Sequence, residues 1–316
     1  MTLEKNPESS LRIAVIGAGI AGLTAADALA ERHDVVVYEA EPVAGGHAHT
    51  VQVEDGLRSR SLDVGFIVYN ERTYPLFTRL LARLAVASQP SEMSFSVQCG
   101  ACDLAYSGRN LRGLLGRPRQ LSRPSYWRLL RDVTRFNRWA RGVTDPPADA
   151  TLGPAVREAG LSDELVRHYV LPMTSAIWSS SVADAEQFPL DLFLRFFSNH
   201  GLLQVRNQPP WRTVTGGSRR YVERFAARLG SRLRCGEGVA TVTREEDGVA
   251  VTPVAGGAER FDRLVVATHT DQALSLLADT DARERELLGA IPYRANDLLL
   301  HTDRSVLPRS RHAWAA

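Results

Sequence analysis

A glycine-rich turn near the N-terminus constrains the fold of this 316-residue chain more than any other feature. Residues 11–16 form a short apolar run, the turn reads Gly17-Ala18-Gly19-Ile20-Ala21-Gly22, and residues 23–31 are rich in alanine. A second apolar run over residues 34–38 ends at Glu39. Strand, GxGxxG turn, helix, strand and acid, in this order, are typical of a dinucleotide-binding βαβ unit. The sequence therefore predicts an α/β fold built on a parallel, Rossmann-like sheet.

Each glycine of the turn has its own physical reason. Gly17 permits the tight bend, Gly19 lets the backbone approach a pyrophosphate, and Gly22 lets the helix pack closely on the strand. The first helical residues offer free amide N–H groups and the positive end of the helix dipole to the phosphates. Glu39 can accept hydrogen bonds from both ribose hydroxyls, and its charge disfavours a 2′-phosphate. The predicted cofactor-binding residues of this unit are Gly17, Gly19, Ile20, Ala21, Gly22, Glu39 and Ala40.

A glycine doublet beyond the acid separates two kinds of dinucleotide site. Gly45 and Gly46 follow Glu39 closely, where a plain NAD-binding domain has no need of them. With this doublet and the later run Leu62-Asp63-Val64-Gly65, residues 12–70 resemble flavoproteins of the amine oxidase and phytoene desaturase type. The resemblance implies FAD as cofactor and a GR2-type FAD-binding domain with an inserted, mainly helical α+β substrate domain. It also implies that the doublet closes over the pyrophosphate and ribitol, with His47 beside it.

Later segments extend the resemblance over most of the chain. Residues 211–218 resemble the glycine loop that precedes a helix in these enzymes, and residues 261–268 resemble the strand that returns to the FAD-binding domain. Residues 238–242 resemble the strand whose backbone, here at Val239, holds the adenine edge. Residues 65–75 resemble a narrower bacterial subgroup of NAD/FAD-binding proteins that is associated with cyclopropane fatty acid synthase-like enzymes.

Two departures from the family affect the expected chemistry. Amine oxidases usually carry arginine after the doublet, where this chain has His47. They often place a lysine near flavin N5, but the corresponding residues 296–302 contain none, and Lys5 is the only lysine of the chain. Direct amine oxidation is therefore less expected than oxidation of another substrate. We predict His301 and Tyr69 as catalytic candidates.

The resemblance also divides the chain into domains. Residues 1–70 and 206–290 are predicted to form the two parts of the FAD-binding domain, and residues 71–205 the inserted substrate domain. Residues 291–316 are predicted to begin a substrate-domain strand. Related enzymes return to the FAD-binding domain after such a strand, so we expect this chain to be truncated at its C-terminus.

The inserted part contains an unusually basic helix. Residues 117–141 carry eight arginines and one acid. Four of these arginines recur at i, i+3, i+7 and i+10 and share one helix face, opposite an apolar face. A basic amphipathic helix can lie on an anionic membrane surface, whereas a solvated arginine face on a packed helix is the commoner case. Both interpretations stay open for Arg128, Arg131, Arg135 and Arg138.

Composition argues against several other functions. Three cysteines cannot build a disulfide framework, and the CxxC of Cys99 and Cys102 lacks the second pair that a zinc site usually needs, because Cys235 stands alone. We predict no metal site and interpret the pair as incidental cysteines at a turn, with a redox dithiol as the alternative. A net charge of +2 provides no strong field for nucleic acid. Residues 1–10 do not resemble a signal peptide, so a cytoplasmic location is expected, peripheral to the inner face of the membrane if the basic helix binds lipid.

Together these features predict an FAD-dependent oxidoreductase. The resemblance implies hydride abstraction from a C–H bond of a small-molecule substrate. The basic helix and the phenylalanine-rich residues 188–203 favour an apolar, lipid-like substrate. Alternatives are flavin amine oxidation, or a non-catalytic flavin-binding partner of a lipid-modifying enzyme.

Overall fold

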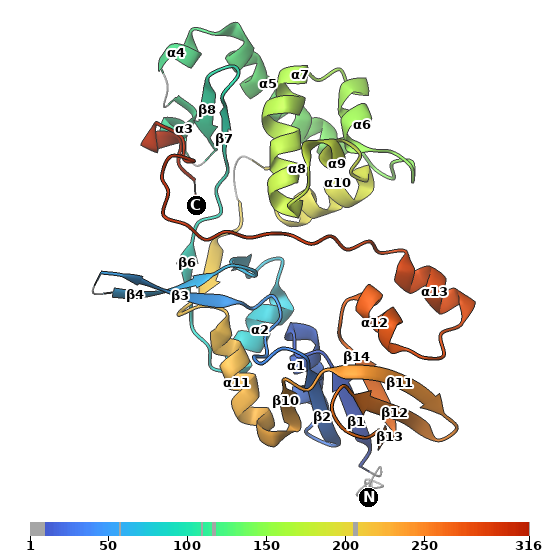
Figure 1. Ribbon diagram of the computed structural model, residues 1–316. Coiled ribbons are helices and arrows are strands. Elements are labelled where there is room, and N and C mark those ends of the chain that lie inside the picture. The colour runs from blue at the N-terminus through green and yellow to red at the C-terminus, as the bar shows by residue number, and fades with distance from the viewer. Residues whose placement is uncertain (1–9, 57, 109, 116–117, 205–207, 316) are drawn as a thin grey trace, which may run out of the picture. The chain divides into compact units, whose positions relative to one another are not determined.

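A computed structural model describes residues 10–56, 58–108, 110–115, 118–204 and 208–315. Lys5, Arg117 and the predicted domain boundary at residues 205 and 206 lie outside these ranges. The chain divides into two compact units, which are described separately (Figure 1). Unit 1 comprises Met1–Ile67, Leu76–Gln89 and Thr213–Ala295, and unit 2 comprises Val68–Pro75, Pro90–Arg212 and Asn296–Ala316.

A four-stranded parallel sheet forms the centre of unit 1. Its strands are β1 (Arg12–Ile16), β2 (Asp34–Glu39), β10 (Leu233–Cys235) and β14 (Arg263–Val266), in the order β10-β2-β1-β14. All neighbouring pairs are parallel. β1 lies between β2 and β14, and β14 comes late in the sequence. The predicted α/β, Rossmann-like fold is confirmed, and residues 263–266, expected to return to this domain, pair with the first strand.

Both faces of this sheet are covered, as its apolar strands require. Side chains alternate across a strand, so every second residue faces the same layer. One face packs on an antiparallel sheet through a core cluster of Ala14, Ile16, Val36, Tyr38, Val242, Val251 and Phe261. The intervening Ile13, Val15, Val35 and Val37 are buried on the opposite face, where α1 (Ile20–Leu29) packs (Figure 1). The antiparallel sheet consists of β11 (Val239–Glu245), β12 (Gly248–Pro253) and β13 (Glu259–Phe261).

A buried carboxylate joins three helices of unit 1. Asp27 of α1 is only 3% exposed and forms ion pairs with Arg228 of α11 (Arg219–Leu229) and, at 2.8 Å, with Arg83 of α2 (Pro75–Arg83). Phe77 of α2 also packs edge to face on two aromatic rings of unit 1. Residues 76–89, which the sequence assigned to the inserted domain, therefore belong to unit 1. The other elements of this part are β3 (Thr50–Asp55), β4 (Arg58–Asp63), η2 (Gly230–Arg232), α12 (Thr270–Leu276) and α13 (Ala282–Gly289). The strands β6 (Ser88–Ser91) and β9 (Trp211–Val214) each belong partly to unit 1 and partly to unit 2.

Unit 2 is mainly helical, with one antiparallel hairpin. The hairpin pairs β7 (Ser96–Cys99) with β8 (Leu104–Ser107). The core is aromatic: Phe193 and Phe197 are fully buried and stack with their ring centroids 3.9 Å apart. These phenylalanines are therefore core residues. The helices are α3 (Leu111–Leu115), α4 (Pro118–Leu121), α5 (Pro124–Gly142), α6 (Leu152–Glu158), α7 (Asp163–Leu165), α8 (Leu171–Trp178), α9 (Val182–Glu186) and α10 (Leu190–Asn199), and the π-helical turn η1 (Val166–Val170) connects α7 to α8. The short strand β5 (Tyr69–Asn70) also belongs to this unit.

The end of the chain differs from its prediction. Residues 291–304 form neither helix nor strand, and only a short 3₁₀ turn, η3 (Arg311–Ala313), follows. The leucines at 298, 299 and 300 are 63%, 81% and 46% exposed. A strand needs a neighbour for its backbone groups, and none of the described strands pairs with this segment. The expected strand at the start of residues 291–316 is therefore wrong for this structure.

No helix in the described ranges has both the length and the apolar composition that a bilayer crossing requires.

A second carboxylate joins the parallel sheet of unit 1 to the antiparallel sheet of β11, β12 and β13. Glu259 of β13 accepts hydrogen bonds from Arg234 of β10 at 2.6 Å, from the Tyr38 hydroxyl at 2.8 Å and from Arg12 of β1 at 2.7 Å. These bonds, from Arg234 first and then from Tyr38 and Arg12, lower the pKa of Glu259 from 4.5 to about 2. The folded state therefore favours the ionised carboxylate more than the unfolded chain does.

We predict that Glu259→Gln reduces stability at neutral pH but not in strong acid. Because the folded pKa is depressed, the contribution of Glu259 is present above pH 4.5 and is lost as the pH falls towards about 2. The carboxylate is 27% exposed, so after allowance for screening we expect the substitution to lower the free energy of unfolding by about 1–2 kcal/mol at pH 7. Urea unfolding at a series of pH values measures this difference in stability between wild type and the variant. Glu246→Gln, in an exposed hairpin turn, is the control, and parallel pH profiles for wild type and Glu259→Gln would contradict the prediction.

Candidate dinucleotide-binding site

Two of the three turn glycines are required by the packing of the protein itself. The Gly17 amide donates to the Tyr38 carbonyl at 2.8 Å, and Gly17 has a φ of +97°, which disfavours other residues. A Cβ at Gly17 would lie 2.9 Å from the Ala267 carbonyl oxygen. At Gly22 a Cβ would lie 1.9 Å from the Gly17 carbonyl oxygen, closer than any real contact. Helix α1 can therefore start directly against the turn only because both positions lack a side chain.

The third glycine is not explained by packing. Gly19 has φ −71° and ψ −178°, which any residue adopts, and a Cβ there would meet no protein atom within 4 Å. Gly19 is also the N-cap of α1, yet no side chain caps this helix and its first turn holds no acid. The following Ile20 and Ala21 are exposed. This helix start therefore presents backbone N–H groups and a positive dipole end to a bound anion.

The predicted acid lies directly beside the turn. Glu39 ends β2, and its Oε2 accepts a hydrogen bond from the Ala18 amide at 2.7 Å, while Oε1 accepts one from the Glu41 amide at 3.0 Å. These two bonds fix the carboxylate next to the glycine turn. Since each carboxylate oxygen can accept more than one hydrogen bond, acceptor capacity remains for ribose hydroxyls.

The glycine doublet lies against the same turn. The Gly45 amide donates to the Ala18 carbonyl at 2.9 Å, and Gly45 forms a parallel bridge with Gly19. Gly46 has a φ of +53°, and a Cβ there would come within 3.3 Å of the Gly19 Cα. The doublet therefore lets a second backbone segment approach the helix start, as expected for a site that closes around a diphosphate.

The remaining predicted residues border this cluster. The Glu237 amide donates to the Glu39 carbonyl at 2.9 Å, and a Cβ on Gly238 would lie 3.3 Å from the Ala40 Cβ, so Val239 starts β11 beside the end of β2. Unit 1 thus contains all the residues predicted to bind the cofactor: Gly17, Gly19, Ile20, Ala21, Gly22, Glu39, Ala40, Gly45, Gly46, His47 and Val239.

Sequence reasoning missed an imidazole and phenol stack at this site. The His47 ring stacks on His269 with centroids 5.8 Å apart, and His269 stacks on Tyr293 at 4.4 Å with an interplanar angle of 9°. His269 follows β14, whose end lies beside the turn because parallel strands end at the same edge. That topology is a signal that the sequence did contain for His269. Tyr293 lies in residues 291–316, which were predicted to begin a substrate-domain strand, and no pattern indicated its position in unit 1.

A second missed contact orders the loop before α11. Asp63 accepts hydrogen bonds from the Ser218 amide at 2.8 and 3.0 Å and from the Thr50 hydroxyl at 2.6 Å. The Thr50 hydroxyl in turn accepts one from the Arg219 amide at 3.0 Å. Hydrogen bonds thus join the run around Asp63 to the glycine loop at 216–218, although the two segments are far apart in the sequence.

The two catalytic candidates both belong to unit 2. Tyr69 lies in β5, is 2% exposed and packs edge to face on Tyr74. His301 is exposed, and its Nδ1 accepts a hydrogen bond from the Asp303 amide at 3.1 Å. Their catalytic roles stay predictions.

Fold comparison identifies oxidase and isomerase neighbours. The chain is similar to cyclohexylamine oxidase from Brevibacterium oxydans IH-35A, with a TM-score of 0.67, 18% sequence identity, and coverage of 89% of this chain and 63% of that one. It is also similar to a CLA-producing fatty acid isomerase from P. acnes, with a TM-score of 0.62, 18% identity, and coverage of 88% and 63%.

Sequence comparison identifies the family. The chain is 27% identical over 265 residues to a Mycobacterium tuberculosis protein named as flavin-containing monoamine oxidase AofH, which covers 80% of this chain and 56% of that protein. The chain thus spans little more than half the length of this relative. The family model of flavin containing amine oxidoreductases matches residues 20–310. The chain therefore belongs to the family of flavin containing amine oxidoreductases, whose cofactor is FAD.

Proposed function

We propose that this chain is part of an FAD-dependent oxidoreductase that abstracts a hydride from a C–H bond of an apolar, lipid-like substrate. One observation carries the proposal. In a chain of this family, the uncapped start of α1, the open position above Gly19 and the carboxylate of Glu39 converge in unit 1. When bound, the flavin supplies the two-electron acceptor, and the protein supplies orientation and electrostatics.

The residues of unit 1 fit FAD as a cofactor. The amides at the start of α1 would hold the pyrophosphate, and the Glu39 carboxylate would accept hydrogen bonds from the adenosine ribose. The Gly45-Gly46 backbone would close over the diphosphate from the other side. His47 would stand where relatives carry arginine, and its stacking on His269 would hold the ring beside the doublet.

The proposed substrate class rests on sequence features near the predicted catalytic residues. Lys5 is the only lysine of the chain, and residues 296–302 offer Asn296, Asp297 and His301 as polar groups instead. The three leucines between them are exposed and would suit an apolar substrate. The names of the relatives favour flavin amine oxidation, which is the second candidate. A third is a non-catalytic partner of a lipid-modifying enzyme such as a cyclopropane fatty acid synthase-like methyltransferase.

A matched pair of glycine substitutions tests the cofactor site. Gly19→Ser should leave the stability of the FAD-free protein within about 0.5 kcal/mol, because serine is a good N-cap and no atom is displaced. It should weaken FAD binding about tenfold or more, because the new side chain occupies the approach to the amides. Gly22→Ala should instead lower stability by about 3 kcal/mol, because its Cβ collides with the Gly17 carbonyl. Urea unfolding measures the stability of each variant, and FAD titration measures its affinity for the cofactor. Normal FAD affinity of Gly19→Ser would contradict the proposal that FAD binds at this site.

Anaerobic flavin reduction tests the substrate class. We expect long-chain unsaturated acyl substrates to bleach the visible absorption of the bound flavin, and primary amines to leave it unchanged. Stopped-flow spectroscopy of the FAD-loaded protein measures the rate, with dithionite as the positive control. Bleaching by amines alone would support the amine oxidase candidate, and bleaching by neither class would support the non-catalytic partner.

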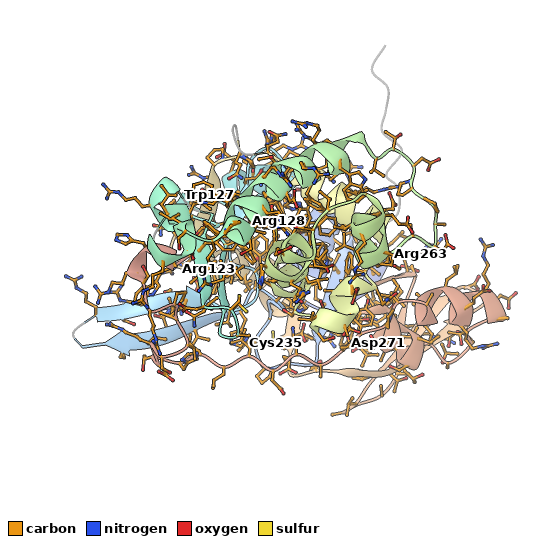
Figure 2. The ribbon with its side chains drawn as sticks, turned by 90° about the horizontal axis from the view of Figure 1, so that it is seen from above. Arg123, Trp127, Arg128, Cys235, Arg263 and Asp271 are labelled. Carbon is orange, nitrogen blue, oxygen red and sulfur yellow. The ribbon has the colours of Figure 1, made fainter. Side chains whose placement is uncertain are left out.

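We also propose that unit 2 contacts an anionic membrane through α5. On this helix Trp127 is 51% exposed, and Arg128 is exposed as well (Figure 2). Arg138 of the same helix is also exposed. The face is partly neutralised, since Arg128 forms an ion pair with Glu164 at 3.3 Å and Arg135 one with Asp132 at 3.0 Å. The proposal therefore depends chiefly on Arg138, Arg128 and the indole of Trp127, which are suited to a headgroup layer.

Vesicle flotation tests this surface. The protein should float with vesicles that contain phosphatidylglycerol and remain in the dense fraction with pure phosphatidylcholine. The double variant Arg128→Gln/Arg138→Gln should reduce binding about 30-fold, at about 1 kcal/mol for each arginine near the surface. Arg195→Gln, an exposed arginine of α10, is the control for general charge. Flotation without dependence on anionic lipid, or unchanged binding of the double variant, would argue for an ordinary solvated helix.

A further inference from the structure

The CxxC pair of unit 2 is joined by a histidine that is distant in sequence. Cys99 ends β7, Cys102 lies in the turn before β8, and His168 belongs to the π-helical turn η1. The Cys102 sulfur and His168 Nε2 are 3.8 Å apart. One sulfur from each cysteine and one ring nitrogen of the histidine all lie within 4.8 Å of one another.

These spacings match a zinc site. Zinc binds thiolate sulfur at about 2.3 Å and imidazole nitrogen at about 2.0–2.1 Å, so the ligand atoms of a tetrahedral site lie about 3.5–3.8 Å apart. Two sulfurs and one nitrogen within the observed distances need only small side-chain adjustments to reach that geometry. A site with three protein ligands leaves the fourth position to water.

The two sulfurs of the pair have different surroundings. The Cys102 thiol, followed by the backbone amides of Cys102 and Ala101, lowers the pKa of Cys99 by hydrogen bonding to its sulfur. Burial raises the pKa of Cys102, although the Leu104 amide and Arg123 act in the opposite direction. Backbone amides thus point at both sulfurs of the turn.

Other hydrogen bonds hold the hairpin and η1 together. The Tyr106 hydroxyl of β8 donates to the His168 carbonyl at 2.6 Å, and Arg123 donates to the Cys102 carbonyl. Both bonds fix the backbone of a cysteine or histidine of the cluster. Such contacts orient ligands before the metal binds and are a regular part of metal sites.

The alternative of a redox dithiol fits less well. Reactive CxxC pairs gain their low thiol pKa largely from the N-terminus of a helix. Here the pair lies in a hairpin turn, in which Asp103 has a φ of +52°, and β8 rather than a helix follows. A dithiol also has no need of an imidazole nitrogen at 3.8 Å.

We propose that Cys99, Cys102 and His168 bind one zinc ion that fastens the β7–β8 hairpin to η1. This replaces the sequence-based interpretation of the two residues as incidental cysteines. The site lies within unit 2, whereas the cofactor residues lie in unit 1, so its occupancy can be measured independently of flavin.

Metal titration of the full chain tests the proposal. The protein is purified with reductant, stripped with a chelator, dialysed against zinc sulfate and analysed by mass spectrometry for metal content. Wild type should bind about one zinc per chain, and Cys102→Ser and His168→Asn should each bind at least about 100-fold more weakly. Cys235→Ser, which removes the cysteine outside the cluster, should bind like wild type. Zinc should also raise the melting temperature of wild type and of Cys235→Ser, but not that of His168→Asn.

Three outcomes would overturn the zinc site. They are wild-type binding well below one equivalent, unchanged affinity of His168→Asn, and a Cys99–Cys102 disulfide without metal in protein prepared without reductant or chelator. Circular dichroism and a cooperative urea unfolding transition show that each variant is folded, so a loss of zinc cannot be assigned to a collapsed chain.

Discussion

The close contact between the start of α1 and the glycine turn is the constraint on which unit 1 depends. A single added methyl at Gly22 would lie 1.9 Å from the Gly17 carbonyl oxygen. That proximity puts the first turn of α1 at the end of β1, where the Ala18 amide meets the Glu39 carboxylate at 2.7 Å. The bridge between Gly19 and Gly45 then adds a third segment to the same place. A backbone restriction at two residues thus assembles three separate parts of the chain around one anion-binding surface.

Local backbone requirements explain why the parallel sheet was predictable. The glycines, the alanine-rich helix and the acid all lie within about thirty residues, so their order defines the βαβ unit without knowledge of distant contacts. The assignment of residues 76–89 to the inserted domain differs from the structure because α2 packs by Phe77 on Phe66 and Tyr221, and the latter lies far along the sequence. The strand expected within residues 291–316 rested on the resemblance to the family, whereas a strand also needs a neighbour for its backbone groups, and none of the described strands supplies one.

The candidate sites show the same division between local and distant information. Glu39 and the doublet were found because short motifs carry them. Cys99 and Cys102 looked incidental because the third member of their cluster is 66 residues beyond Cys102, in a turn that no periodicity reveals. His269 could have been found by following β14 to its end, since its neighbour in the sheet is known from topology. Tyr293 offered no such route.

The π-helical turn η1 has a consequence for how the segment from α7 to α8 presents its side chains. An extra residue in one turn shifts the angular phase of everything that follows by about 100° around the axis. No single stripe of side chains can therefore run along the whole segment, and the two helices have different neighbours: α7 contacts α5, whereas α8 contacts α9. Deleting one residue of η1 would restore an ordinary α-helical repeat and shorten the helical segment by one residue. It would also rotate every α8 side chain away from its present partners. An inserted residue, in this sense, lets one continuous helix serve two packing surfaces.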